Sequence, residues 1–483
     1  MAEARLIETP RAGGRLGLER RSIDFIPEAE RHGRVRDQAP FWFLSNFQFF
    51  AIAIGFVGPS LGLSLGWTVL AGTLGILIGT VFQAFHASQG AEMGLPQMIQ
   101  SRAQFGYRGV VVPLVGDMIS LVGYNVVGAV LISEGANGLW GVHRMVSILA
   151  VALVSGALAI WGHDWLHRAF RWLFWISLPL FTALSLAIAL GRIGGGVPAH
   201  GGFNAAAFLT QLASAVSLNV TAAPYVSDYT RYLPSATSRR SIIASVFAGS
   251  ALSGVWLIAL GAWLASHMGV GDGLVAIRLA GDRLAPGLGS LLAAVSIAAL
   301  TATMGMSSYS GMLTTFTTAD SLRHLSPTQP ARILVIIGLT AVAFGVAAAF
   351  GGNAVAWLNG MLVVVLYFLI PWTAVNLADY FWVRRGRYAI LDLFTPSGLY
   401  GAWGARGLTA YALGFCASLP FFVVPGLFTG PLAARLGGVD FGWLVGLAVS
   451  AGAYLGLSWN FSPESETEAV EASRRALADQ SLS

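Results

Sequence analysis

The chain has 483 residues, of which 55% are hydrophobic and only 11% are charged, and its formal net charge is +5. Soluble globular domains carry about 25% charged residues, so this composition argues against an ordinary soluble enzyme and against a disordered chain. Twelve helices of about 20 residues would occupy roughly 240 residues, which fits a membrane protein with many spans and short loops. The single cysteine, Cys416, excludes an internal disulfide and a cysteine-based metal cluster.

Apolar segments bounded by charges, Gly and Pro predict twelve membrane-spanning helices. They cover residues 41–64, 66–87, 109–135, 144–162, 169–191, 205–228, 241–265, 287–317, 331–350, 354–381, 407–427 and 440–459. The flanking segments 1–38 and 460–483 are polar and are expected to be cytoplasmic tails. Residues 462–483 are expected to include a short surface helix.

All 28 basic residues are Arg, and their distribution over the loops predicts the orientation. With twelve spans, 23 arginines fall on the side of the two termini and only five on the other: Arg144, Arg192, Arg278, Arg283 and Arg435. Cytoplasmic loops are enriched in Lys and Arg, so both termini are expected in the cytoplasm and the protein in the cell (inner) membrane. Because the positive charge is spread over every inner loop, no nucleic-acid partner is expected.

Two spans combine polar residues with a helix-breaking Gly or Pro. The span at 41–64 contains Asn46, Gln48 and a Gly55 to Pro59 interruption, and the span at 205–228 contains Asn219 and Pro224. A broken backbone inside a membrane is tolerated only where it lines a cavity. The two spans are five apart, as in a 5+5 repeat, and paired interruptions of this kind indicate a transporter site.

The eighth span, 287–317, is rich in hydroxyl side chains, including Thr301, Thr303, Ser307 and Ser308. Hydroxyls bind hard cations such as Na⁺ and polar substrates. They also bond back to the carbonyl four residues earlier or bridge helices, and that structural role is the more common one for any single residue. The cluster is therefore more informative than its members.

Three motifs resemble the nucleobase–cation symport-1 family of purine, cytosine and allantoin permeases. They are Gly94–Gly109 after the second span, Asp228–Pro234 after the sixth, and Pro371–Tyr388 at the end of the tenth. The resemblance covers about residues 40–425. It implies an all-α polytopic membrane protein of the leucine-transporter type, with repeats at 39–191 and 205–381 followed by two extra helices at 407–459. It also implies alternating-access import of a nucleobase or related small heterocycle with H⁺ or Na⁺, no cofactor and no enzymatic activity.

The resemblance places the substrate between spans 1, 3, 6 and 8, stacked on aromatic residues. The span 3 aromatic corresponds to Tyr124, a ring that can stack on a flat base while Asn125 reads its edge. The chain departs from the family at Asn219, where an aromatic is usual, and at Gly128, where a polar residue is common. Ser307 and Ser308 lie near a position that often holds Asn. The full set of expected substrate residues is Gln48, Phe50, Tyr124, Asn125, Gly128, Asn219, Thr221, Ser307 and Ser308.

The same resemblance places a Na⁺ site at the carbonyls of Asn46 and Phe49 and the hydroxyl of Thr301, with Thr303 as a substitute ligand because Ala302 lacks a hydroxyl. This incomplete set favours H⁺ slightly over Na⁺. A proton route needs an acid inside the membrane, and Asp117 in span 3 is the first choice. Two further acids, Asp228 and Asp379, end spans 6 and 10, where ion pairs with Arg231 and Arg384 are expected.

Two alternatives remain open from the sequence. One is a symporter of the same architecture for another small solute, such as a vitamin or an amino acid. The other is a membrane enzyme built on His86, Glu92, His143 or the group His163, Asp164 and His167, whose helical spacing allows a metal contact. A solvated interfacial face is the favoured interpretation of that group, so no metal is expected beyond Na⁺. The oligomeric state is not predicted.

Overall fold

The computed structural model describes residues 22–194, 201–325, 327–349 and 354–481. In these ranges the chain is almost entirely helical, apart from the short antiparallel pair β1 (Val423–Val424) and β2 (Phe428–Thr429). Nine of the described helices are long and apolar enough to cross a membrane, and a bent helix pair makes a tenth. An all-α polytopic membrane protein is therefore confirmed, while the count of twelve spans stays a prediction.

The long helices follow the predicted spans closely. They are α4 (Leu65–Met93), α7 (Val111–Trp140), α8 (Arg144–Trp161), α9 (His163–Ala189), α10 (Ala205–Val220), α12 (Arg239–His267), α14 (Leu288–Leu322), α15 (Gln329–Ala349) and α16 (Ala354–Ala378). Two shorter ones, α17 (Ala405–Ser418) and α19 (Gly442–Leu457), occupy the positions of spans 11 and 12.

The first span is broken into α1 (Val35–Asn46), α2 (Phe49–Ile54) and α3 (Val57–Ser60), with a bend of 53° between α1 and the rest. Its main break lies at Phe47 and Gln48, where the backbone leaves the helical region, and a smaller interruption at Gly55 and Phe56 separates α2 from α3, as the sequence suggested. The Gln48 side chain accepts a 2.6 Å hydrogen bond from the Phe50 amide and so caps α2. A polar cap, rather than a glycine, therefore ends one helix and starts the next.

The sixth span breaks where Pro224 predicts it. Helix α10 ends at Val220, a 3₁₀ turn η3 runs over Ala223–Tyr225, and α11 covers Val226–Thr230. Proline supplies no amide hydrogen, so the α-helical ladder cannot pass through it.

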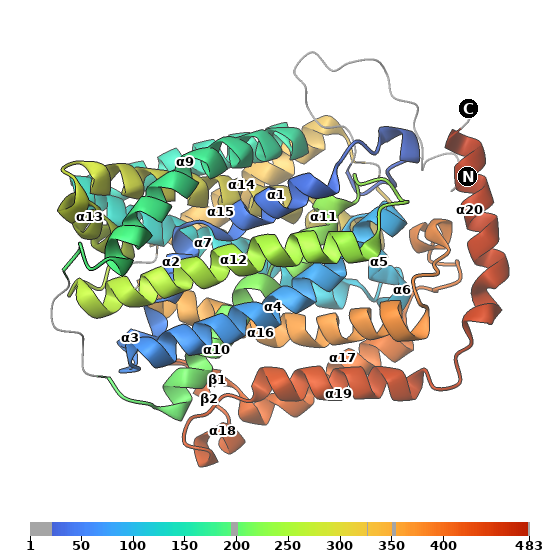
Figure 1. Cartoon of the computed structure of the whole chain (residues 1–483). Helices are drawn as coiled ribbons and strands as arrows, with labels where there is room; N and C mark the ends of the chain where they lie inside the picture. Colours follow the sequence, from blue (N-terminus) through green and yellow to red (C-terminus); the bar gives the residue numbers. More distant parts are fainter. Residues whose placement is uncertain (1–21, 195–200, 326, 350–353, 482–483) are drawn as a thin grey trace.

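The contacts between helices occur in matching pairs. When each helix of a contact is replaced by the helix at the same position in the other half of the ten-span core, the result is another observed contact. Helix α1 packs on α12 as α10 packs on α4, and α1 packs on α9 as α10 packs on α16. In the same way α8 contacts α14 while α15 contacts α7. Figure 1 shows α1, α12 and α4 running side by side through the bundle. This is the pattern that two related five-helix repeats produce, and the repeat boundaries themselves remain predictions.

Three features differ from the sequence prediction. Helix α13 (Gly273–Leu284) was not expected, because its charges at Arg278, Asp282 and Arg283 hide an amphipathic helix that packs on α14. The predicted span 407–427 ends as a helix at Ser418, since Pro420 and Pro425 follow within seven residues. Helix α1 begins at Val35, inside the segment predicted to be a tail.

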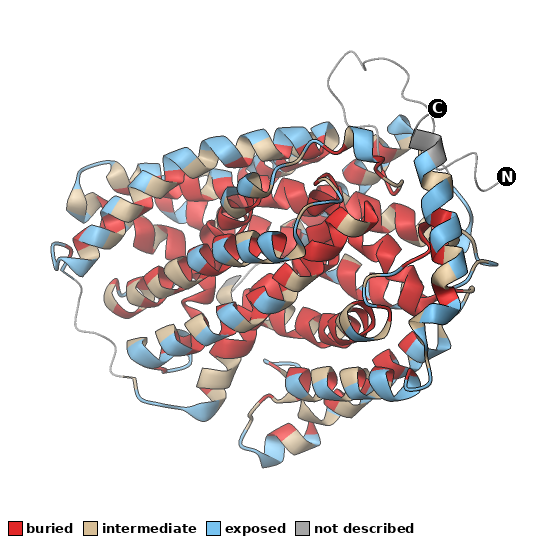
Figure 2. Cartoon of the chain, turned by 45° about the vertical axis from the view of Figure 1, so that its right-hand side comes forward, coloured by how far each residue is buried: buried red, intermediate tan, exposed pale blue. Residues whose placement is uncertain are grey.

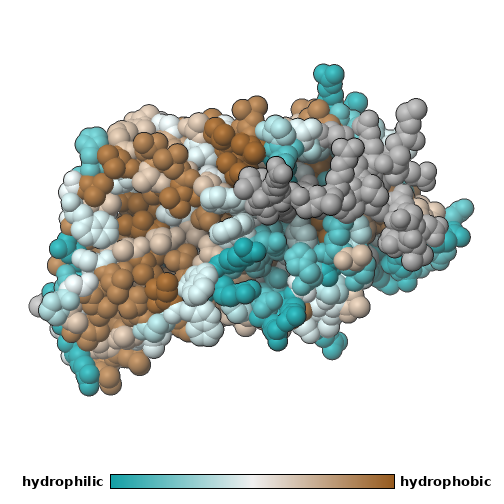
Figure 3. All heavy atoms as spheres, turned by 90° about the horizontal axis from the view of Figure 1, so that it is seen from above, coloured by the Kyte–Doolittle hydropathy of each residue, from teal (hydrophilic) through white to brown (hydrophobic). Residues whose placement is uncertain are grey.

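The buried residues lie at the centre of the bundle and the outer helices expose large apolar side chains. Figure 2 shows the buried (red) core enclosed by half-exposed outer helices. Trp172 on α9, Leu153 on α8 and Leu334 on α15 are 73%, 65% and 70% exposed. Figure 3 shows this apolar (brown) surface over much of one face, bounded by hydrophilic (teal) residues at one end. Such a belt suits contact with lipid tails.

Both flanking segments pack at the same end of the bundle. Helix α20 (Thr467–Ser481) runs along the right-hand end in Figure 1 and confirms the expected helix near the C-terminus. From Ser22 onward the N-terminal segment is held by backbone bonds from Ile26 to Gly94 and from Gly33 to Tyr232, each 2.9 Å. The part of the predicted tail before Ser22 lies outside the described residues. We call this side of the molecule the α20 end.

Candidate functional site

One face of α7 is bonded to α14 at three successive helical turns. Asn125 donates to the Ser308 hydroxyl at 2.9 Å, the Leu121 carbonyl accepts from Ser307 at 3.1 Å, and Asp117 accepts from Thr314 at 2.6 Å. Residues 117, 121 and 125 are four apart, so a helix places them in one row. The structure thus brings together the predicted residues of spans 3 and 8.

An aromatic pair lies beside this row. The rings of Phe50 and Tyr124 are stacked with centroids 4.4 Å apart and an angle of 20°. Gln48 donates a 2.8 Å hydrogen bond to the Tyr124 hydroxyl, and the Thr303 hydroxyl also interacts with that phenol. Residues from the broken span 1, from span 3 and from span 8 therefore meet around one aromatic ring.

Two polar atoms at this site are buried without a hydrogen-bond partner among the described residues: Asn125 Oδ1 and Asp117 Oδ1. Asp117 is fully buried and Asn125 is 3% exposed. A buried acceptor without a donor is destabilising by about 1–3 kcal/mol, so such atoms are rare unless a ligand, an ion or a proton completes them.

Asn219 forms hydrogen bonds to side chains of two other helices. Its carbonyl oxygen accepts a 2.6 Å hydrogen bond from Asn46, and its amide donates a 2.6 Å bond to Thr80 on α4. Asn46 also donates to the Ser250 carbonyl at 3.1 Å. The side chains of Asn46 and Asn219 thus tie the end of α1 to the end of α10.

Two further expected substrate residues face protein atoms. The Met304 sulfur would lie 3.0 Å from a Cβ built on Gly128, so this glycine allows α14 to approach α7 closely. The Thr221 hydroxyl bonds to the Leu218 carbonyl at 2.8 Å, within the last turn of α10.

The expected Na⁺ ligands on α14 form intrahelical bonds. Thr301 donates to the Ile297 carbonyl at 2.8 Å and Thr303 to the Ala299 carbonyl at 3.0 Å. These bonds use the hydroxyl hydrogen and leave the oxygen lone pairs, so they are compatible with a cation. Asn46 and Phe49 lie on either side of the span 1 break.

Comparison with known proteins agrees with this architecture. A family model described as permease for cytosine/purines, uracil, thiamine and allantoin matches residues 25–446. A putative purine-cytosine permease of Bacillus subtilis is 32% identical over 440 residues, covering 90% of this chain and 95% of the relative. The chain belongs to the nucleobase–cation symport-1 family of permeases. It is a membrane transporter and not an enzyme, as the three motifs predicted.

Solved structures share the fold of this permease. Mhp1, a nucleobase-cation-symport-1 family transporter in a closed conformation with bromovinylhydantoin bound, aligns with a TM-score of 0.70 at 19% identity, over 94% of this chain and 99% of Mhp1. A Na⁺-coupled sialic acid symporter in a substrate-bound outward-open state aligns with a TM-score of 0.60 at 14% identity, covering 90% and 92%.

Buried ion pairs and hydrogen bonds link neighbouring segments at the α20 end of the permease. Asp379 accepts hydrogen bonds from Gln104, Tyr388 and Tyr454 and pairs with Arg384 at 2.7 Å, which confirms that expected pair. The other expected partner, Arg231, donates to the Ser22 carbonyl at 2.6 Å and to the Tyr309 hydroxyl at 3.3 Å.

A second buried pair, Arg102 and Asp320 at 2.8 Å, lies at the same end. Burial lowers the pKa of the Arg102 guanidinium, and the neighbouring Asp320 carboxylate opposes that shift. Burial, followed by the same carboxylate, raises the pKa of Tyr107 to about 12, so its hydroxyl stays protonated and donates to Asp320 at 3.0 Å.

The sequence did not identify several residues that contact and position the predicted residues. Thr80 on α4 anchors Asn219, and Met304 fills the space beside Gly128. Gln104, Tyr388 and Glu466 belong to the Asp379 network. For Thr80 the available signal was a polar side chain inside an apolar segment, but its partner Asn219 lies on another helix.

Proposed function

We propose that this permease imports a planar nucleobase or a related heterocycle of the purine, cytosine, allantoin or hydantoin type by alternating access, together with a cation. The family description and the named relatives support this substrate class. The observation that carries it is the buried Asn125 oxygen, without a donor, next to the stacked rings of Phe50 and Tyr124.

The chemistry of this site matches a flat, hydrogen-bonding ligand. An aromatic ring stacks on a planar base, and offset stacking contributes about 0.5–1.5 kcal/mol beyond the buried area. Nucleobases and hydantoins carry N–H donors in the ring plane, which is what the unsatisfied Asn125 oxygen requires. Gln48 supplies a further polar group at the Tyr124 hydroxyl, and Ser308 supplies one beside Asn125.

We further propose that the coupling ion is H⁺ carried by Asp117, with Na⁺ as the competing candidate. Asp117 is fully buried, and only one of its carboxylate oxygens is bonded, to Thr314. Tyr225 at the span 6 break and Asp228 beyond it are near enough to interact electrostatically with Asp117. Polar groups therefore connect Asp117 with the α20 end. Asp117 lies seven residues before Tyr124, about 10 Å along the helix.

The arginine distribution supports an orientation in the cell membrane with both described ends of the chain in the cytoplasm. Segment 22–34 and α20 lie at one end, which also carries Arg102, Arg231, Arg239 and Arg384. With this orientation, substrate enters from the opposite end, and transport is import.

A binding screen tests the substrate class. Purified protein is heated with purines, pyrimidines, hydantoins, vitamins and amino acids, and the melting temperature is recorded. A nucleobase or hydantoin is expected to stabilise the wild type and Tyr124→Phe, which keeps the ring. The same ligand is expected to have no effect on Tyr124→Ala.

Unchanged affinity in Tyr124→Ala, with normal folding shown by gel filtration, would rule out stacking on this ring. Stabilisation by amino acids or vitamins alone would favour the second candidate, a symporter of the same fold for another solute.

The coupling ion is tested in proteoliposomes. An imposed pH gradient is expected to drive uptake of the screened ligand in the wild type. Accumulation driven by a Na⁺ gradient at constant pH would contradict the proton proposal and assign the coupling to the site at Asn46, Phe49, Thr301 and Thr303.

A further inference from the structure

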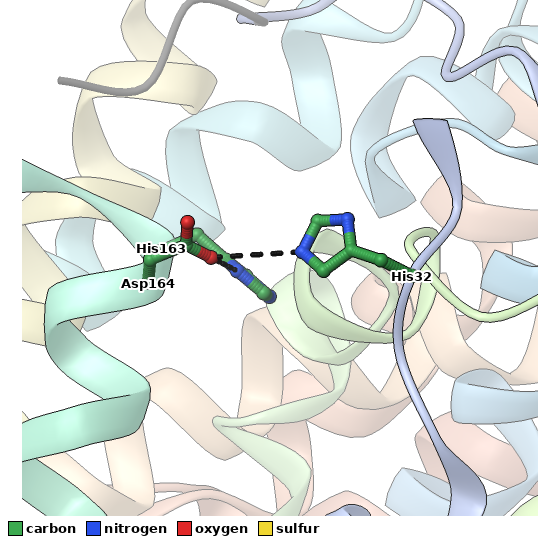
Figure 4. A group of neighbouring side chains, drawn as sticks. All are labelled: His32, His163 and Asp164. Carbon is green, nitrogen blue, oxygen red and sulfur yellow. Dashed lines mark hydrogen bonds and ion pairs between the residues drawn. The ribbon is translucent and has the colours of Figure 1, made fainter. Parts of the chain in front are cut away.

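Three potential metal ligands from two distant segments meet at the α20 end, outside the substrate site. His32 lies in the loop before α1, and His163 and Asp164 form the first turn of α9. One ligand atom from each residue lies within 4.8 Å of the others. Figure 4 shows His32 and His163 both directed at the Asp164 carboxylate.

The distances are close to those around a bound transition metal. His163 Nδ1 lies 3.2 Å and His32 Nε2 lies 3.7 Å from Asp164 Oδ1. Ligands at about 2.0–2.2 Å from a tetrahedral Zn²⁺ are separated by about 3.3–3.5 Å. The three ligand atoms lie within 4.8 Å of one another, so the side chains must move closer together to bind one ion, and His32 and Asp164, 62% and 61% exposed, have room to do so.

A hydrogen bond from the other ring nitrogen of His32 fixes which nitrogen can bind a metal. Its Nδ1 lies 2.8 Å from the Glu30 carbonyl, which can only accept, so Nδ1 carries the hydrogen. In the neutral ring Nε2 then presents a lone pair toward the Asp164 carboxylate. A cation placed between this nitrogen and the carboxylate would be attracted by both. A backbone carbonyl on the other ring nitrogen is also the usual partner of a metal-bound histidine.

Helix geometry fixes the other two ligands. Gly162, with φ of 83°, turns the chain from α8 into α9 and acts as the N-cap residue. The turn places His163 against Tyr232, with ring centroids 4.4 Å apart, so that imidazole is packed in position. Sequence spacing alone identified His163, Asp164 and His167, but His32 lies 131 residues from His163 and was not part of that group.

We propose that His32, His163 and Asp164 bind one Zn²⁺ or a similar borderline divalent cation, which fastens the segment before α1 to the start of α9. Two imidazoles and one carboxylate suit Zn²⁺ and leave a fourth position for water. Hard cations such as Mg²⁺ prefer oxygen ligands and are not expected to compete. Segment 22–34 is also bonded to Gly94 and Tyr232, so the cation adds to the contacts that hold this segment at the α20 end.

Titration of the purified, chelator-treated full chain with ZnCl₂ tests the site. One Zn²⁺ per chain is expected, with no heat from MgCl₂. His32→Ala and Asp164→Asn are each expected to weaken binding on the order of tenfold or more. His143→Ala and His324→Ala serve as matched controls, because these histidines lie elsewhere and are expected to leave binding unchanged.

A second measurement tests whether the cation holds segment 22–34 in place. Zn²⁺ is expected to slow protease cleavage within residues 22–34 of the wild type and to have no such effect on His32→Ala. Melting temperatures in EDTA check that all variants fold. Absence of binding, equal affinity in His32→Ala, or binding without protection of this segment would overturn the proposal. Neither measurement depends on the transport substrate.

Discussion

Asn46 donates a 2.6 Å hydrogen bond to the side-chain oxygen of Asn219, 173 residues away, and so joins the breaks of spans 1 and 6. Both side chains are almost completely buried. Because the amide of Asn219 continues to Thr80, three helices, α1, α10 and α4, meet through one side chain. Asn219 therefore links the two broken spans and α4 through hydrogen bonds.

Replacing this joint is expected to destabilise the protein. Asn219→Ala removes two buried hydrogen bonds and leaves groups on Asn46 and Thr80 less satisfied, for a loss of about 1–3 kcal/mol in the free energy of unfolding. Thr80→Val removes only one of these bonds and is expected to lose about half as much. Denaturant unfolding in detergent measures both. Equal stability of Asn219→Ala and wild type would show that the bonds contribute nothing.

Asn125 offers a test of substrate recognition apart from stacking. Asn125→Leu keeps a side chain of similar volume and removes the unsatisfied oxygen, so affinity for the screened ligand is expected to fall about tenfold, or roughly 1.4 kcal/mol. The matched control is Ser133→Ala, about two turns further along α7, whose buried hydroxyl bonds to the Val130 carbonyl. That variant is expected to keep its affinity within about twofold. Titration calorimetry distinguishes the two outcomes.

The Asp117–Thr314 pair makes a prediction about coupling. Asp117→Asn keeps the shape and removes the titratable group, so uptake driven by a pH gradient is expected to disappear. Exchange of labelled for unlabelled substrate, which needs no net proton movement, is expected to continue. Thr314→Val leaves the acid in place and should retain gradient-driven uptake with an altered pH dependence. Full accumulation by Asp117→Asn would exclude this residue as the proton carrier.

Much of the fold was predictable because each membrane span is a continuous apolar segment that can be recognised in the sequence. The apolar runs marked the long helices, and Pro224 marked the break of span 6. The interruption of span 1 at Gly55 was predicted, but the larger break at Gln48, whose side chain caps α2, was not. Helix α13 escaped detection because hydropathy finds buried spans and not amphipathic helices that cover them.

The predicted site residues come from several spans, and their roles in binding stay predictions. Tyr124, Asn125 and Ser308 lie together as expected, because periodicity and the family motifs both locate them. The hydrogen bonds of Asn219 to α1 and α4 were not predicted, because a single sequence does not show which residues contact one another in the fold. Tertiary packing decides which polar side chains remain available to a ligand.

A buried acid, Glu466, bonds the C-terminal segment to Arg384 at the end of span 10. Glu466, with a side chain 9% exposed, accepts two hydrogen bonds from Arg384, at 3.0 and 3.1 Å, and Arg384 in turn pairs with Asp379. Removing one partner of a buried charge pair is strongly destabilising, by about 3–5 kcal/mol, when the other charge stays buried. Arg384 keeps Asp379, so Glu466→Ala is expected to lose less, about 1–3 kcal/mol.

The local consequence is the sharper test. Without Glu466, the chain leading into α20 loses its contact with span 10, and protease cleavage around residues 460–466 is expected to accelerate. Glu468→Ala is the matched control, because Glu468 lies two residues further on and is exposed. Equal cleavage rates in the two variants would mean that α20 is held mainly by its packing on Ile390–Phe394, where Ser473 accepts a hydrogen bond from Leu391.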